Sequence, residues 1–203
     1  MNPVLAHRQL KCDLCIVGGG LSGSFAALAA ARHGKNVILM QDRPMLGGNA
    51  SSEIRMWVRG ARGPYNRETG LISELEERNI HGNPTLVSSV FDATLYGMLM
   101  ENPNIQLLMN TSCMDAEEKD GKIVSVSGWQ LTTYTYFTVF ADIFADCSGN
   151  SILAPLTGAN FRYGREAIEE FGESLAKGKA DKCTMGMSIM LAARETDHPV
   201  KFI

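Results

Sequence analysis

Two short stretches decide the fold of this chain: LCIVGGGLSG at residues 14–23 and VILMQDR at residues 37–43. In the first, an apolar strand runs into a G-x-G-x-x-G pattern made by Gly18, Gly20 and Gly23. In the second, which follows an alanine-rich helical segment, another apolar strand ends in polar side chains. Strand, glycine turn, helix and strand at this spacing are typical of a βαβ unit that binds a dinucleotide.

Each glycine of the pattern has a mechanical role. Gly18 permits a tight turn out of the strand, Gly20 lets the backbone approach a pyrophosphate, and Gly23 lets the helix pack closely on the strand. The helix that begins near Ser22 presents free N–H groups and the positive end of its dipole. We therefore expect the phosphates of a dinucleotide at residues 18–23.

The composition predicts a globular protein with a substantial core, because 45% of the 203 residues are hydrophobic and the formal net charge is −3. No basic stripe is present, which argues against a nucleic-acid partner. No apolar run is long enough to span a bilayer or to act as a signal peptide, so we expect no membrane partner. Five scattered cysteines are typical of a reduced, cytoplasmic protein: Cys12, Cys15, Cys113, Cys147 and Cys183.

Cys12 and Cys15 form a C-x-x-C motif, which raises a redox or zinc interpretation. No second pair completes a zinc site. Both cysteines fall in the first strand, where residues three apart are expected to point to opposite faces of the sheet. We therefore predict two small buried residues in a strand, and no metal site.

Hydrophobic periodicity predicts the remaining elements of an α/β domain. Helices are expected over residues 22–33, 69–79 and 89–101, and a short buried strand over residues 105–109. A β-meander at about 111–142, with strands near 122–127 and 133–140, precedes a final strand of the parallel sheet at 143–145. Together these elements predict a Rossmann-like nucleotide-binding domain over residues 1–160, with the meander inserted into its parallel sheet.

The composition changes after about residue 158. A charged helix is expected over residues 165–176, and a further strand over residues 184–191. We interpret residues 161–203 as the start of a second, substrate-binding domain, and we expect the chain to be a fragment of a longer protein.

Four blocks of the sequence resemble one family: residues 15–23, residues 41–55, the meander and residues 144–164. They resemble the FAD-dependent oxidoreductases of the glutathione-reductase-like fold, flavoproteins with two dinucleotide-binding folds. The nearest likeness is to a bacterial group with a GGNASSEIR-like segment after the second strand, some of whose members carry carbohydrate-related names. Residues 47–55 of this chain read GGNASSEIR. The resemblance implies FAD as the cofactor.

The resemblance also implies which residues hold FAD. The pyrophosphate would be held by Gly18, Gly20, Ser22 and Gly23. The adenosine half would lie near Gln41, Asp42 and Arg43, with the adenine against backbone atoms at Cys113. The ribityl chain and the flavin ring would be approached by Gly47, Gly48, Asn49, Ala50 and Ser51. A second contact turn would be formed by Asp146, Gly149 and Asn150.

One position departs from the family pattern. Most relatives place a glutamate at the end of the second strand to bind the adenosine ribose, whereas this chain has Gln41 followed by Asp42. An amide still donates and accepts hydrogen bonds, so either residue remains a candidate for the ribose. The missing acid also weakens the case for tightly bound NAD, whose site uses an acid here.

The disulfide reductases of this fold carry a redox-active cysteine pair directly after the Gly-Gly. Residues 49–52 of this chain read NASS, and the next cysteine is Cys113. Because a flavin–disulfide relay needs its thiols beside the flavin, the sequence argues against such a relay.

Glu53 and Arg55 are the candidate catalytic residues, because in the resembling group this segment lies near the flavin. Two apart on an extended segment, they are expected to point the same way. We hypothesise that Arg55 stabilises negative charge on reduced flavin or on a substrate oxygen, and that Glu53 orients Arg55 or moves a proton. The alternative is a structural ion pair beside the cofactor. His81, expected in a loop, is a further candidate base.

Three functions follow from these observations. The first is an FAD-dependent oxidoreductase that exchanges hydride or electrons with a small organic substrate, for which a carbohydrate-derived compound is one candidate. The second is a flavin mono-oxygenase-like enzyme. The third is a non-catalytic binding protein that keeps the fold, as the Rab GDP-dissociation inhibitors do, and the intact glycine pattern at residues 18–23 argues against it.

Overall fold

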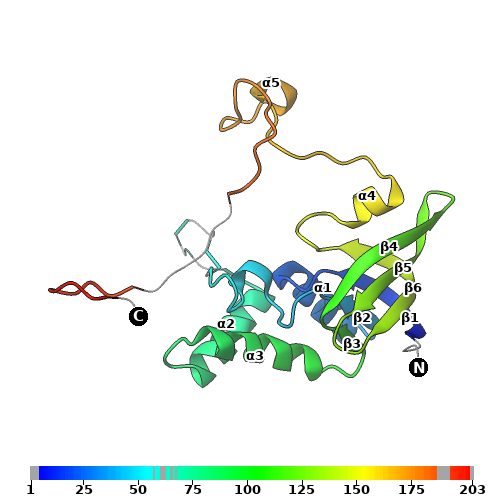
Figure 1. Cartoon of the computed structure of the whole chain (residues 1–203), viewed down its shortest axis with the longest axis horizontal. Helices are drawn as coiled ribbons and strands as arrows, with labels where there is room; N and C mark the ends of the chain where they lie inside the picture. The colour runs from blue at the N-terminus through cyan, green and yellow to red at the C-terminus, as the bar shows by residue number, and fades with distance from the viewer. Residues whose placement is uncertain are drawn as a thin grey trace. The chain divides into compact units, whose positions relative to one another are not determined.

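The computed structural model describes residues 5–56, 58–59, 63–64, 66, 68–186 and 193–201. One six-stranded sheet is present, in the order β3-β2-β1-β6-β5-β4 (Figure 1). Its strands are β1 Ala6–Val17, β2 Val37–Met40, β3 Ile105–Leu108, β4 Thr111–Lys119, β5 Lys122–Gln130 and β6 Thr135–Asp146. Strands β3, β2, β1 and β6 are parallel, whereas β5 and β4 continue the sheet in antiparallel fashion. The structure thus confirms the α/β class with a largely parallel sheet.

Three helices, α1 Leu21–Arg32, α2 Leu71–Gly82 and α3 Ser88–Met100, bury their apolar residues in a common cluster with strands β1, β2 and β3. The cluster contains Leu28 of α1, Leu75 of α2, Leu95 and Leu99 of α3 and Leu39 of β2, all fully buried. These helices confirm the predicted ones, with ends that differ by one to three residues. Among the described helices, none combines the length and the apolar character needed to cross a membrane.

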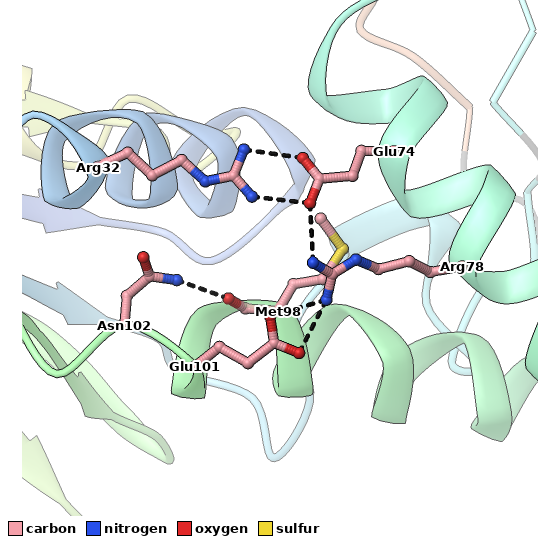
Figure 2. Close-up of polar contacts among 6 residues, drawn as sticks. All are labelled: Arg32, Glu74, Arg78, Met98, Glu101 and Asn102. Atoms are coloured by element: carbon pink, nitrogen blue, oxygen red, sulfur yellow. Dashed lines mark hydrogen bonds and ion pairs between the residues drawn. The ribbon is translucent and has the colours of Figure 1, made fainter.

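A chain of ion pairs joins the same three helices at the carboxyl ends of α1 and α3 (Figure 2). Arg32 donates two hydrogen bonds to the Glu74 carboxylate, at 2.8 and 2.7 Å. Arg78 lies 3.0 Å from Glu74 and donates to Glu101 at 2.8 Å. The side chains are partly exposed, so this network holds the helix ends together without entering the apolar core.

The meander differs from the prediction in one respect. Residues 133–140 and 143–145 were expected to be two strands, but β6 runs without a break from Thr135 to Asp146. Its whole length pairs with β1, which begins at Ala6, eight residues before the apolar stretch that starts at Leu14. Because β1 supplies a continuous parallel partner, the junction between the meander and the parallel sheet becomes the middle of one strand.

Cys12 and Cys15 are both buried in β1, as predicted, but they do not lie on opposite faces. Both pack in the same apolar cluster, together with Val17. The regular alternation of β1 is interrupted between them, where the N–H groups of Asp13 and Leu14 both donate to the Asn36 carbonyl oxygen, at 3.0 and 3.2 Å. Burial raises the pKa of both thiols. Within the described residues, no group of His, Cys, Asp and Glu side chains is arranged to hold a metal ion.

The chain divides into two compact units, Met1–Tyr163 and Gly164–Ile203. The first carries the sheet and ends in the short helix α4, Leu153–Thr157. In the second, the expected helix over residues 165–176 is wrong, because only α5, Ile168–Phe171, is helical. Gly172 ends α5 in a left-handed conformation (φ +69°). Of the strand expected over residues 184–191, residues 184–186 are irregular and the rest lie outside the described residues.

Candidate cofactor site at the strand ends

The turn between β1 and α1 is packed tightly enough to require glycine at two positions. Gly18 has φ +103°, and a Cβ there would overlap the carbonyl group of Cys147. A Cβ at Gly23 would overlap the carbonyl oxygen of Gly18. These two glycines are therefore fixed by contacts within the protein, whatever the turn binds.

Gly20 differs from both neighbours in the pattern. Its φ is −61°, and a Cβ built on it meets no described atom within 4 Å. It is the N-cap of α1, no side chain of the described part caps the helix, and no acid lies in its first turn. The exposed Ser22 lies in that first turn. The start of α1 thus combines open space with uncompensated N–H groups and a positive helix dipole.

A second glycine turn lies directly against the first. Gly47 and Gly48 both have positive φ, +105° and +57°, and lead into the 3-10 turn η1, Gly48–Ala50. The Gly47 N–H donates to the carbonyl oxygen of Gly19 at 2.8 Å, and a Cβ on Gly48 would lie 3.2 Å from the Cα of Gly20. Ser51 closes the turn, since its hydroxyl donates to the Gly48 carbonyl oxygen at 2.7 Å. Two backbone segments without side chains therefore face the same space.

The side chain of Gln41 connects the two glycine turns. Its Oε1 accepts the N–H of Gly19 at 2.6 Å, and its Nε2 donates to the carbonyl oxygen of Met45 at 3.0 Å. The residue is 4% exposed. Asp42, by contrast, has a side chain that is 60% exposed, with the Arg43 guanidinium 3.8 Å away. The structure thus separates two neighbours that the sequence left as alternatives, one buried and engaged and the other at the surface.

Glu53 and Arg55 are not paired as expected. Residues 52–54 form a turn, and Arg55 has φ +64°, so the expectation of an extended segment is wrong. Glu53 instead lies 3.5 Å from Arg43, and the Arg55 Nε donates to the carbonyl oxygen of Ser52 at 3.1 Å. The reason is local: the Ser51 carbonyl oxygen accepts the N–H of Arg55 at 2.8 Å and so folds the chain back. Both side chains remain exposed at the rim of the second glycine turn.

Asp92 of α3 is a contributor that the sequence analysis missed. Its carboxylate accepts the Ser52 N–H at 2.9 and 3.2 Å, and the residue is only 9% exposed. It thereby attaches the second glycine turn to α3. A signal existed in the sequence, because Asp92 falls three and seven residues before Leu95 and Leu99, on the apolar face of its helix. A lone acid on such a face has to find a partner.

The turn between β6 and α4 is organised by Asp146. One carboxylate oxygen accepts the N–H and the hydroxyl of Ser148, at 3.0 and 2.7 Å, and the other accepts the N–H of Leu153 at 2.8 Å. Gly149 has φ +78°, and Asn150 beside it is exposed. This turn meets the first glycine turn where Cys147 packs against Gly18.

Two further candidates lie away from these turns in the chain. Cys113 is half-buried on β4, where burial raises the pKa of its thiol to about 11, with a further contribution from Asp146. His81 was expected in a loop, but the structure places it in the last turn of α2, exposed. Asn49 and Ala50, in contrast, lie within η1, beside the two glycines that lead into it.

Comparison with known proteins gives the class to which this site belongs. The family model described as FAD dependent oxidoreductase matches residues 13–201, so the chain belongs to this family.

Among curated relatives, a 41-residue stretch is 46% identical to FAD-dependent oxidoreductase dbaF of Emericella nidulans. It covers 20% of this chain and 9% of that protein.

Two solved structures show the same fold at low sequence identity. One is p-nitrophenol 4-monooxygenase PnpA from Pseudomonas putida DLL-E4, with a TM-score of 0.54 and 14% identity over 77% of this chain and 45% of that one. The other is a geranylgeranyl bacteriochlorophyll reductase-like protein from Thermoplasma acidophilum, with a TM-score of 0.51 and 19% identity over 75% and 43%. The chain thus spans less than half the length of each of these relatives.

The residues of the site fit FAD, the cofactor of this family. A Cβ at Gly20 would fill the open space before α1, where a pyrophosphate needs close backbone contact. The second glycine turn borders that space, with Gly48 against Gly20. The site lies at the carboxyl ends of parallel strands, where open α/β sheets bind their ligands.

Proposed function

We propose that this chain forms the FAD-binding part of an oxidoreductase that exchanges hydride or electrons with a small organic substrate. The observation that carries the proposal is the contrast within one motif. Gly18 and Gly23 are crowded by the protein, whereas Gly20 opens onto empty space at the uncapped start of a helix. No contact within the described protein requires glycine at position 20, so a ligand that contacts the backbone closely explains the residue.

The test is an FAD titration of the purified chain, followed by flavin fluorescence and by the visible flavin spectrum. We expect the wild-type chain to bind FAD, and Gly20→Ala to weaken binding at least tenfold, because the added methyl group occupies the pyrophosphate position. A chain that binds no FAD would contradict the proposal and favour a non-catalytic protein of the same fold.

FAD, when bound, supplies the redox chemistry, and the protein orients the substrate. Arg55 and Glu53 follow the second glycine turn in the chain. Arg55 contacts the Ser52 carbonyl oxygen and Glu53 contacts Arg43, so we propose separate roles for them. Arg55 stabilises negative charge at the substrate or flavin, whereas Glu53 positions Arg43 at the adenosine side. Arg55→Leu is expected to slow reduction of bound flavin by substrate at least tenfold, and Arg55→Lys to retain part of the rate. Equal rates in all three proteins would leave Arg55 with a structural role.

The finer placement belongs to the same proposal. Residues 47–55, which read GGNASSEIR, support the bacterial group of the glutathione-reductase-like fold, and carbohydrate-derived hydroxyl compounds are therefore the first substrates to test. All five cysteines are unpaired thiols, which supports a reducing, cytoplasmic setting.

A mono-oxygenase is the second candidate. The p-nitrophenol 4-monooxygenase has the same fold, but at 14% identity this likeness concerns the fold alone. A hydroxylated product formed in proportion to oxygen and NADPH would favour the mono-oxygenase, and oxygen-independent substrate oxidation would favour the first candidate.

A further inference from the structure

The side chain of Gln41 uses both ends of its amide at once. The carbonyl end accepts from Gly19 in the first glycine turn, and the amino end donates to Met45, just before the second glycine turn. An ionised carboxylate only accepts hydrogen bonds, so a glutamate would satisfy the first contact and place an oxygen against the Met45 carbonyl oxygen. The geometry at this position therefore demands a neutral amide.

The backbone of Gln41 is fixed by hydrogen bonds on both sides. Its N–H donates to Leu108 of β3 at 2.9 Å, and its carbonyl oxygen accepts the N–H of Thr111 at 2.8 Å. With 4% of the residue exposed, the amide is enclosed between the two turns that it connects. Breaking either contact would leave a buried polar group unsatisfied.

We propose that Gln41 is a positioning residue that locks the two glycine turns of the FAD site together, and that contact with the adenosine ribose passes to Asp42. The inference rests on the FAD site proposed above and goes beyond it by dividing two roles between adjacent residues. Most relatives carry the acid, a glutamate, at the position of Gln41, whereas in this chain the acid is Asp42, one residue later.

Asp42 has the properties that the ribose contact requires. Its carboxylate follows directly after Gln41 at the carboxyl end of β2, and its side chain is 60% exposed. A carboxylate accepts hydrogen bonds from two neighbouring hydroxyl groups, as the acid does in dinucleotide sites of this kind. Its neighbour Arg43 is 3.8 Å away and equally exposed, so hydroxyl groups can reach the carboxylate.

The contacts of the Gln41 side chain with Gly19 and Met45 also determine which N–H groups remain for the phosphates. The Gly19 N–H is bound by Gln41, and the Gly18 N–H donates to Met40 at 2.8 Å. Phosphate contacts therefore begin at Gly20, where the space is open. Holding both glycine turns in place before the ligand arrives reduces the ordering that binding would otherwise require.

The test compares Gln41→Glu with Asp42→Asn in the same 203-residue chain. Two quantities are measured between pH 5 and pH 8: the thermal unfolding midpoint without ligand and the FAD dissociation constant. For Gln41→Glu we expect a lowered midpoint and about tenfold weaker FAD binding at pH 8, because the introduced carboxylate faces the Met45 carbonyl. Both defects should shrink toward pH 5, where the protonated carboxyl can donate as the amide does.

Asp42→Asn should behave in the opposite way. We expect an unchanged unfolding midpoint, because the replaced side chain is exposed, together with FAD binding about tenfold weaker at every pH from 6 to 8. Binding of ADP and 2′,3′-dideoxy-ADP adds a second check, since loss of the ribose hydroxyls should weaken binding to the wild-type chain and to Gln41→Glu more than to Asp42→Asn.

The inference is overturned if Gln41→Glu keeps the wild-type midpoint and FAD affinity at pH 8, or if Asp42→Asn binds FAD as the wild type does. A wild-type chain that fails to bind FAD would overturn the proposed function. The unfolding midpoint of Gln41→Glu would still test whether Gln41 holds the two glycine turns together, because that measurement needs no ligand.

Discussion

The turns at the ends of β1 and β6 lie against each other, yet they are built by opposite means. Residues 18–23 are held by the absence of side chains, since Gly18 and Gly23 allow backbone to approach backbone. Residues 146–153 are held by one side chain, because the Asp146 carboxylate accepts three hydrogen bonds. The first turn therefore leaves Gly20 at the uncapped start of α1, whereas the second binds the N–H groups of Ser148 and Leu153 to its own carboxylate. We therefore expect the phosphates at the first turn.

The two turns also depend on each other. The Cys147 N–H donates to the Val17 carbonyl oxygen at 2.7 Å, and the Cys147 carbonyl occupies the place of a Cβ on Gly18. A change in either turn should therefore displace both, and the predictions below separate this shared packing from ligand binding.

The largest effect is expected for Gly23→Ala. Its methyl group would overlap the Gly18 carbonyl oxygen, and backbone at the centre of the sheet cannot move aside without shifting Cys147 as well. We expect unfolding free energy to fall by about 3 kcal/mol, at the upper end of overpacking effects. Urea unfolding of the ligand-free chain measures it.

Gly20→Ala is the matched control for that variant. The same methyl group enters open space at φ −61°, so ligand-free stability should fall by no more than about 1 kcal/mol, the cost of alanine at an N-cap, while FAD binding weakens. Equal loss of stability in both variants would show that the distinction between crowded and open glycines does not hold.

A smaller effect is expected for Asp146→Ala. Three donors, from Ser148 and Leu153, lose their acceptor, but the turn is accessible to water, which replaces part of the loss. We expect a decrease of about 2 kcal/mol in unfolding free energy. The exposed Asp142 on the same strand offers a control, because Asp142→Ala should change stability by less than about 0.5 kcal/mol.

Asp146→Ala also tests the division of labour between the turns. If Asp146 only shapes its own turn, Asp146→Ala should weaken FAD binding only indirectly, through the shift of Gly18 that follows when Cys147 moves. Asp146→Asn should then keep most of the wild-type stability, because its side-chain oxygen still accepts hydrogen bonds. An Asp146→Asn protein with wild-type stability and strongly weakened FAD binding would instead place the carboxylate against the cofactor.

Sequence reasoning succeeded where a backbone requirement forces a residue type. The steric contacts at Gly18 and Gly23 admit only glycine, so the glycine pattern predicted the turn correctly. The apolar periodicity of residues 89–101 likewise predicted α3. The FAD-dependent oxidoreductase family and its cofactor followed from such blocks, and the match over residues 13–201 confirms this coarser assignment.

Two of the missed features depend on contacts between residues distant in sequence, and a third on a local turn. The local turn is the one at residues 52–54, where the Ser51 carbonyl oxygen accepts the Arg55 N–H and the Ser51 hydroxyl accepts the Glu53 N–H. Glu53 lies 3.5 Å from Arg43, and the extended segment assumed from the sequence did not predict this contact. The Asp92 contact with Ser52 joins residues 40 apart. The interrupted alternation between Cys12 and Cys15 coincides with hydrogen bonds from Asp13 and Leu14 to Asn36, more than 20 residues away. Such partners become visible only once the fold has brought them together.

The smallest effect is expected at the other end of α1, far along the helix from the glycine turn. Arg32→Met removes two hydrogen bonds to Glu74 while Arg78 remains beside that carboxylate (Figure 2). Because the side chains are partly exposed, we expect a loss of about 0.5–1 kcal/mol at pH 7, less in 1 M salt, and unchanged FAD affinity. The hydrogen bonds from Arg32 lower the pKa of Glu74 in the folded state, so this stability is present above the unfolded pKa of about 4.3 and disappears as the pH falls through the lower folded value. The difference between wild type and Arg32→Met in urea unfolding should therefore shrink as the pH falls below about 4.3. A change in FAD affinity would show that the charged end of α1 is coupled to its glycine end.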